Sequence, residues 1–419
     1  MFADNHANKE IPQSELVSGF KVAQISVGVA ITLPAFLVAA ETFSALGFYT
    51  GLVALAAAGL ILFMVASGTM IVGARTRVST YTIIAAVFGR IPAIGVNLLI
   101  VAVLLGWFAV TISIFGSALL GALQNVTGLE IPLWIAKVSG GVLMTLITLY
   151  GFHAIDKLSR VIVPLLALML VAAFFVGMRN ADFAALLNSS GDRQNIKSLG
   201  EAISILVGAF MVGVTIVPDM ARFLRAPSHA ILASGLSYGF GSQLVFVFSG
   251  VPALVTGEKD FVANLLAIGF GFPALFVVTF ATLTTNVNNL YSTSLSLRQV
   301  FATIRDSQMT LLAGSVGTAV ALLGIENVFI PFLVFLGIAI PPIAGVYTTH
   351  ILSGRAKDGF GAEIGVHKIA VAAWFIGALG ALISTNHWID LTFIPAIDGF
   401  LISAIFYLAA KTGQDRVQR

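Results

Sequence analysis

The sequence predicts an all-α integral membrane protein with about twelve transmembrane helices. Of its 419 residues, 58% are hydrophobic and only 10% are charged, whereas a soluble domain carries roughly a quarter charged residues. So few charges cannot cover a water-facing surface, and apolar runs of spanning length recur along the whole chain. The chain has no cysteine, which excludes structural disulfides and thiolate metal sites.

Twelve apolar runs are interpreted as membrane spans. In chain order they cover residues 20–43, 51–72, 93–122, 133–151, 161–176, 202–217, 231–255, 272–295, 311–325, 329–351, 370–383 and 393–410. The apolar run 261–270 is shorter, and we expect an outer hairpin or an interfacial helix there.

The basic residues support this map. If the N-terminus is cytoplasmic and the chain crosses twelve times, 17 of the 22 Lys and Arg residues fall on the cytoplasmic side, as the positive-inside rule predicts. If the map contained one helix too many or too few, the basic residues would be distributed over both sides of the membrane. The sequence therefore predicts that both termini are cytoplasmic. The five remaining basic residues are Lys137, Arg179, Arg193, Lys197 and Lys259.

Glycine and proline interrupt two of the predicted spans at corresponding places. The first span contains Gly28 and Pro34, and the sixth contains Gly208, Gly213 and Pro218, about 180 residues later. Glycine and proline are common in membrane helices, so each interruption alone says little. Paired interruptions in two halves are typical of inverted-repeat transporters, whose unwound backbone lines a central cavity.

This pattern divides the chain into five segments. We expect a cytoplasmic tail at 1–19, a transport core at 20–351 with halves at 20–178 and 200–351, two C-terminal helices at 352–410, and a cytoplasmic tail at 411–419.

The eighth span carries the densest group of polar side chains. Thr284, Thr285, Asn286, Asn288 and Asn289 occupy five of six positions. Such residues can serve as interhelical glue. Five in six positions exceed that need, and hydroxyl oxygens together with free carbonyls suit a small, hard cation.

Trp107 lies near the middle of the third span, away from the interfaces where tryptophan is usual. Its flat face could stack on a planar heterocycle, a contact worth about 1–3 kcal/mol per base. Ordinary packing explains the residue equally well from sequence alone.

Motifs of other function classes are absent from the sequence. There is no glycine-rich phosphate loop, no HExxH and no Ser-His-Asp arrangement in register. We therefore expect neither an enzyme nor a nucleic-acid-binding protein. No ATPase domain is present, so uphill transport would need an ion gradient.

Four segments resemble the nucleobase–cation symporter family 1, most closely its bacterial cytosine permease branch. They are GWF at 106–108, GAFMVGVTIVPDMARFLR at 208–225, TTNVNNLY at 284–291 and AIPPIAGV at 339–346. The resemblance implies a five-plus-five inverted-repeat core with two extra C-terminal helices in a bacterial inner membrane. It also implies a planar base held between helices one, three, six and eight. We expect a monomer.

The resemblance also implies roles for particular residues. Trp107 would stack on the base and Phe210 would close the pocket. The implied substrate-binding residues are Trp107, Phe210, Val212, Gly213 and Asn288. A sodium ion would take the hydroxyls of Thr284 and Thr285 and the carbonyls of Gly28, Ile31 and Ala281.

Three positions depart from the family pattern, and all concern the substrate. Leu104 stands where the cytosine permeases have Gln, Val212 replaces a Ser, and Val287 replaces an acidic residue. Lost side-chain partners would weaken selectivity for cytosine.

The resulting hypothesis is sodium-coupled import of a nucleobase, with cytosine favoured, by alternating access. Alternatives are the same fold carrying hydantoin, allantoin, a purine or hydroxymethylpyrimidine, and coupling to protons instead of sodium. A membrane receptor or enzyme would need an apparatus outside the helices, for which the short loops leave no room. No other cofactor is expected.

Overall fold

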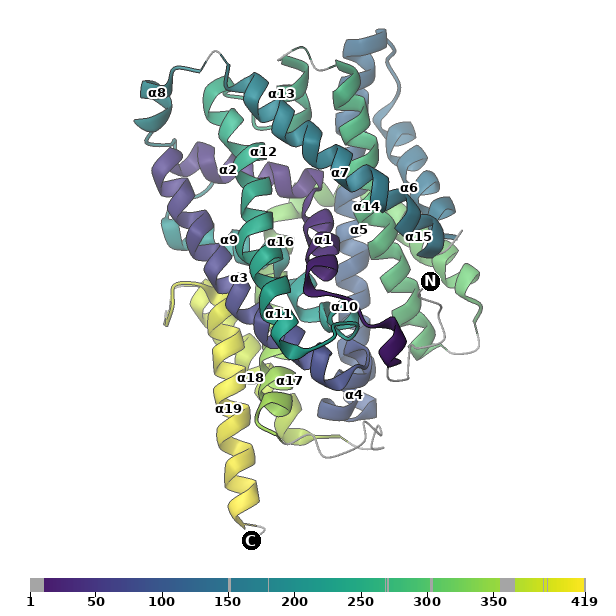
Figure 1. Ribbon diagram of the computed structural model, residues 1–419, viewed down its shortest axis with the longest axis vertical. Helices are drawn as coiled ribbons and strands as arrows, with labels where there is room; N and C mark the ends of the chain where they lie inside the picture. The colour runs from purple at the N-terminus through teal and green to yellow at the C-terminus, as the bar shows by residue number, and fades with distance from the viewer. Residues whose placement is uncertain are drawn as a thin grey trace.

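The computed structural model describes residues 11–149, 152–179, 181–267, 269, 271–301, 304–354, 366–386, 388–389 and 391–417. Within these ranges every regular element is a helix, and the only β-type pairing is an isolated bridge between Val17 and Leu224. The helices form one elongated bundle (Figure 1). The predicted all-α class is confirmed.

The helices follow the predicted spans closely. The first half of the chain contains α1 (Gly19–Ala30), α2 (Leu33–Leu46), α3 (Phe48–Thr76), α4 (Thr80–Phe88), α5 (Arg90–Thr127), α6 (Leu133–Leu149), α7 (Phe152–Gly177) and α8 (Phe183–Leu187). The second half contains α9 (Leu199–Ile216), α10 (Pro218–Ala221), α11 (Pro227–Ser234), α12 (Ser242–Thr256), α13 (Phe261–Ala267), α14 (Gly271–Val300), α15 (Asp306–Leu322), α16 (Phe329–Ala339), α17 (Pro341–Leu352), α18 (Lys368–Thr385) and α19 (Pro395–Val417).

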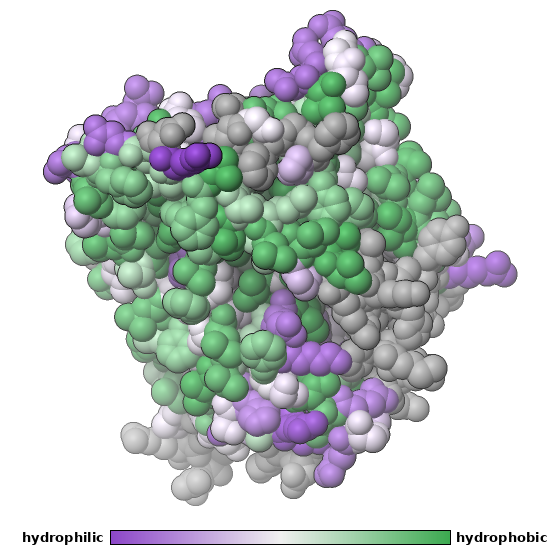
Figure 2. Space-filling view, turned by 45° about the horizontal axis from the view of Figure 1, so that its top comes forward, coloured by the Kyte–Doolittle hydropathy of each residue, from purple (hydrophilic) through white to green (hydrophobic). Residues whose placement is uncertain are grey.

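Many of these helices are long and apolar enough to cross a membrane. Among the described residues seven qualify by length and composition, and the bent pair α1 and α2 makes eight if it counts as one span. Three shorter apolar helices add to these. The space-filling view shows a broad hydrophobic band bordered by hydrophilic residues (Figure 2). The count of twelve crossings and the segment boundaries stay predictions.

The break predicted in the first span is confirmed. α1 and α2 meet at an angle of 73°. Thr32 is extended at φ −146° and ψ 149°, and Pro34, which has no N–H to donate, lies in the first turn of α2. The amide of Ile31 donates to the carbonyl of Gly28 at 3.3 Å and ends α1.

The interruption predicted in the sixth span is confirmed at Pro218 and wrong at the two glycines. α9 runs without interruption through Gly208 and Gly213, and the helix is interrupted only at Val217, before Pro218. Close packing does not require either glycine, because an added Cβ would make only ordinary van der Waals contacts. A Cβ on Gly208 would lie 3.5 Å from the carbonyl oxygen of Leu333, and one on Gly213 would lie 3.5 Å from the hydroxyl of Tyr238.

The joint after α9 is held by side chains from two other helices. The hydroxyl of Tyr347 in α17 donates to the carbonyl of Thr215 at 2.7 Å. The hydroxyl of Thr80 in α4 donates to the carbonyl of Ile216 at 3.2 Å, and its amide donates to Oδ1 of Asp219 at 2.7 Å. These contacts satisfy carbonyls that a helix C-terminus leaves without partners.

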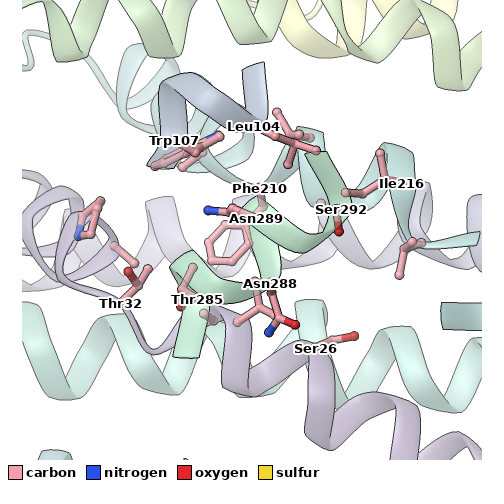
Figure 3. A pocket seen from close by; sticks show the side chains of 18 of the residues that line it. Ser26, Thr32, Leu104, Trp107, Phe210, Ile216, Thr285, Asn288, Asn289 and Ser292 are labelled. Carbon is pink, nitrogen blue, oxygen red and sulfur yellow. The ribbon is translucent and has the colours of Figure 1, made fainter. Parts of the chain in front are cut away.

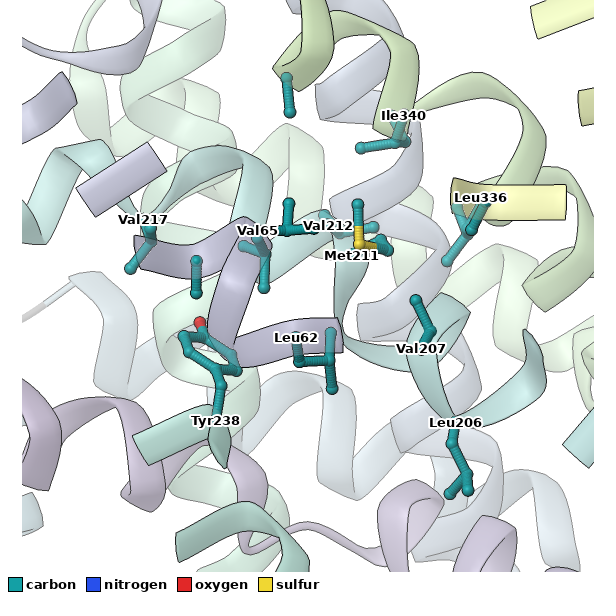
Figure 4. Packing of buried hydrophobic residues seen from close by; sticks show 14 of the residues in the cluster. Leu62, Val65, Leu206, Val207, Met211, Val212, Val217, Tyr238, Leu336 and Ile340 are labelled. Carbon is teal, nitrogen blue, oxygen red and sulfur yellow. The ribbon is translucent and has the colours of Figure 1, made fainter. Parts of the chain in front are cut away.

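A core of apolar side chains fixes α9 between its neighbours. Leu62 and Val65 of α3 pack with Val207 and Met211 of α9, and Leu336 of α16 lies beyond them (Figure 4). All five are buried. Burying such side chains stabilises a fold by about 1.5–3 kcal/mol each relative to exposure to water. Where the helices face lipid instead of water, the stabilisation comes from close van der Waals packing.

The two ends of the bundle differ in charge. The basic end carries Arg77 and Arg225, whose backbones are linked to the N-terminal segment through Ile11 and Val17. At the opposite end, which we call the acidic end, Lys259 contacts the carboxylates of Glu41 at 3.0 Å and Asp192 at 3.8 Å.

Candidate functional site

The break between α1 and α2 opens onto a cavity of about 160 Å³ inside the bundle. A single water needs about 10–15 Å³ on the same scale, so the cavity can hold a small ring compound. It is lined by α1, α2, α5, α9, α10 and α14, together with Tyr238 from the π-helical segment Gly235–Gly241 between α11 and α12. Polar groups line only part of it, as is usual for small-molecule sites.

Six of the ten predicted site residues line this cavity. They are Trp107, Phe210, Val212, Gly213, Asn288 and Thr285. The other four, Gly28, Ile31, Ala281 and Thr284, are buried beside it, and the neighbours of Ile31 on both sides, Ala30 and Thr32, line it. The structure thus brings residues from four distant helices to one place.

Aromatic neighbours hold Trp107 in position. The rings of Phe329 and Phe332 in α16 contact its indole edge-on, at centroid distances of 6.1 and 5.8 Å. Phe332 lies directly against Gly106, where a Cβ would come within 2.6 Å of its ring. Such contacts fix the indole, which faces the cavity (Figure 3).

Phe210 is held in the same manner. Its ring contacts Tyr238 at 6.1 Å and Phe246 at 5.4 Å, both edge-on. Trp107 from α5 and Phe210 from α9 therefore both present rigid aromatic surface to the cavity. A planar ring bound between these helices would have an aromatic face to stack on.

Three buried hydroxyls at the cavity have no hydrogen-bond partner among the described residues. They belong to Ser26, Thr32 and Thr285, which are 5%, 8% and 7% exposed. A buried polar group without a partner costs about 1–3 kcal/mol, so such oxygens in a cavity wall indicate a ligand, an ion or water. Thr32 and Thr285 lie near each other at the break (Figure 3).

The threonine pair of α14 fits a cation. The hydroxyl of Thr284 donates to the carbonyls of Phe280 and Ala281 at 3.0 and 3.2 Å, which leaves its oxygen lone pairs available. The hydroxyl of Thr285 neither donates nor accepts a hydrogen bond among the described residues. Oxygen donors of this kind are what a hard cation prefers.

The polar cluster of α14 divides into two roles. Asn286 is fully buried and donates to the carbonyl of Phe108 at 3.0 Å, so it joins α14 to α5. Asn288 and Asn289 line the cavity, with one N–H of Asn288 donating to the carbonyl of Thr284. The same motif therefore contains a residue that joins two helices and residues that line the cavity.

Sequence reasoning missed several lining residues. Ser26, Thr32, Thr111, Asn289, Ser292, Asp219 and Tyr238 line the cavity without having been assigned to the substrate or the ion. Only Asn289 stood in the polar cluster. Ser292 lies seven residues after Thr285, a spacing that places both on one helix face and could have identified it.

Comparison with known proteins places the chain in a family. A family model described as a permease for cytosine/purines, uracil, thiamine and allantoin matches residues 11–404. The chain belongs to this permease family. Its members are membrane transporters, so this chain is a multi-pass transporter and not an enzyme.

Relatives of this family align over nearly the whole chain. The cytosine permease of Escherichia coli strain K12 is 26% identical over 405 residues, which covers 97% of this chain and 94% of that protein. The cytosine permease of Escherichia coli O157:H7 has the same identity and coverage.

Solved structures show the same fold. The nucleobase-cation-symport-1 transporter Mhp1, in a closed conformation with bromovinylhydantoin bound, matches with a TM-score of 0.82 at 20% identity and covers 99% of this chain and 96% of its own. Its inward-facing conformation matches with a TM-score of 0.84 at 17% identity, over 100% and 95%. A Na⁺-coupled sialic acid symporter matches with a TM-score of 0.66 at 14% identity, over 93% and 88%.

Proposed function

We propose that the protein imports a nucleobase, with cytosine favoured, together with sodium by alternating access. The observation that carries this proposal is the convergence of Trp107, Phe210 and the free hydroxyl of Thr285 on one cavity beside the break at Thr32. The family's description includes cytosine, and the curated relatives are cytosine permeases.

In this proposal the ion and the base occupy adjoining parts of the cavity. Sodium takes the hydroxyls of Thr284 and Thr285 and the carbonyls of Gly28, Ile31 and Ala281, and so bridges the break to α14. The base stacks on Trp107, Phe210 closes the pocket beside Val212 and Gly213, and Asn288 contacts the base edge. Bound sodium fixes the break and prepares the stacking site, which couples the two ligands.

The orientation predicted by charge determines which end of the cavity would release the base. The basic end faces the cytoplasm of a bacterial inner membrane, with both termini inside. Release into the cytoplasm then passes Ser292 and Met220, which are partly exposed.

One sodium ion per base supplies enough energy for accumulation. A potential of about 100 mV provides roughly 2.3 kcal/mol, and a tenfold sodium gradient adds about 1.4 kcal/mol. Together they support a gradient of about 500-fold.

Uptake of one labelled base in a transport-deficient strain, in competition with a panel of heterocycles and with sodium replaced by choline, tests the proposal. We expect competition by planar bases, loss of uptake without sodium and a loss of at least tenfold in Thr285→Ala. Thr293→Ala is the control, because Thr293 is a buried threonine of the same helix whose hydroxyl bonds to the carbonyl of Asn289 and which does not line the cavity. Failure of every heterocycle to compete would refute the substrate class. Sodium-independent uptake that survives Thr285→Ala would indicate proton coupling instead.

A further inference from the structure

The walls of the cavity differ in polarity from one helix to the next. All four lining residues of α14 are polar, namely Thr285, Asn288, Asn289 and Ser292. None of the five lining residues of α9 has a polar side chain: they are Ala209, Phe210, Val212, Gly213 and Ile216. Leu104 of α5 lies on the apolar side, across from Asn288 and Ser26 (Figure 3).

Between Ala209 and Val212 the backbone of α9 does not compensate for this lack of polar side chains. Because α9 is regular from Leu199 to Ile216, the N–H and carbonyl groups between Ala209 and Val212 bond within the helix. Farther along, the carbonyls of Thr215 and Ile216 accept from Tyr347 and Thr80, whereas Pro218 has no N–H to donate to the carbonyl of Val214. The wall formed by Ala209–Val212 and Leu104 therefore offers a ligand apolar contact only.

A heterocycle that stacks on Trp107 must match both walls. Its polar edge belongs against Asn288 and Asn289, where hydrogen bonds replace those it made to water. A ring nitrogen or carbonyl turned toward Leu104 and Val212 would lose its water and gain no partner. A C–H edge or an alkyl group loses nothing there and gains apolar contact.

Building on the proposed function, we infer that the substrate is a planar ring with its hydrogen-bonding groups on one side and a hydrocarbon edge on the other, and that an alkyl group on that edge strengthens binding. Pyrimidines fit this description, because their C5–C6 edge carries only C–H groups. Hydantoin fits through its C5 edge. Purines and allantoin do not fit, since an imidazole edge or a ureido group places polar atoms against the α9 wall.

Binding of matched ligand pairs to the purified protein tests this inference. The pairs are uracil with thymine, cytosine with 5-methylcytosine, and hydantoin with 5-methylhydantoin. We expect the methylated member to bind about fourfold more tightly, the ratio that corresponds to about 0.8 kcal/mol per buried CH₂. Adenine and allantoin should bind more weakly than either pyrimidine pair.

Val212→Ser tests the wall itself and should reduce the methyl preference to no more than about twofold. Val214→Ser is its matched control, because Val214 lies in the same helix and is fully buried but does not line the cavity, so its methyl preference should persist. Equal or weaker binding of the methylated members to the unmutated protein would overturn the inference while leaving the proposed function intact. If no heterocycle bound at all, the proposed function would fail first and this inference with it.

Discussion

Replacing Glu326 with leucine would remove the carboxylate partner of a lysine that cannot reach water. Glu326 lies in the turn Ile325–Val328 that connects α15 to α16, and Lys137 lies in α6. Their charged atoms are 2.5 Å apart, and the side chains are 29% and 5% exposed. The ammonium also donates to the carbonyl of Ala321 at 3.0 Å, near the C-terminus of α15.

Replacing Glu326 should destabilise the protein more than replacing Lys137. Removing one partner of a buried pair costs about 3–5 kcal/mol, and the remaining bond to Ala321 places Glu326→Leu near 3 kcal/mol. Lys137→Met leaves a carboxylate that is partly exposed and can hydrate, so we expect about 1–2 kcal/mol. The double variant leaves no buried charge and should recover to within about 1 kcal/mol of the unmutated protein.

Thermal unfolding of the detergent-purified protein would measure this order. We expect the lowest midpoint for Glu326→Leu, a smaller decrease for Lys137→Met and substantial recovery in the double variant. Two additive decreases in the double variant would show that the residues do not interact, and an unchanged midpoint for Glu326→Leu would refute the reasoning.

Two further predictions concern the neighbourhood of Trp107 and the pH dependence of stability. Gly106→Ala places a Cβ within 2.6 Å of the Phe332 ring, so it should displace Phe332 and Trp107, destabilise the protein by about 1–3 kcal/mol and weaken heterocycle binding. Gly95→Ala in the same helix meets nothing within 4 Å and should leave binding unchanged, so equal binding by the two variants would contradict the packing argument. Partial burial alone would raise the pKa of Glu326, but the hydrogen bonds from Lys137, the backbone and Ser113, together with the charge of Lys137, outweigh burial and hold the pKa below its usual value. The stabilisation that ionised Glu326 contributes is therefore complete above the pKa of about 4.3 that its carboxyl has in the unfolded chain. It is lost as the pH falls through the lower pKa of Glu326 in the folded protein. Below about pH 4 the unfolding midpoint should fall more steeply in the unmutated protein than in Lys137→Met/Glu326→Leu, and parallel curves would argue against a depressed pKa.

Features set by local chemistry were predictable from the sequence. Pro34 after Gly28 marked the break between α1 and α2, because proline cannot donate the helical bond and starts a new turn. The spans followed from apolar runs that lipid requires. Trp107 and Asn288 were candidates because a mid-span indole and a polar cluster are unusual in lipid, and the family resemblance assigned them to the substrate.

Features set by tertiary packing were not predictable. Gly208 and Gly213 predict an interruption in sequence, whereas α9 continues regularly through both residues. Asn286 is indistinguishable from Asn288 until its bond to α5 is known. Single small hydroxyls such as Ser26 give no signal, because serine occurs widely in membrane helices and only burial without a partner sets this one apart.

The central claim is that one cavity at the α1–α2 break holds a planar heterocycle and sodium together. Calorimetric titration of the purified protein with cytosine, in sodium and in choline, tests it most directly. The account predicts tighter binding in sodium and, for Trp107→Ala, a loss of about 5- to 150-fold, equivalent to about 1–3 kcal/mol of stacking. The same affinity in both salts, together with unchanged binding by Trp107→Ala, would contradict it.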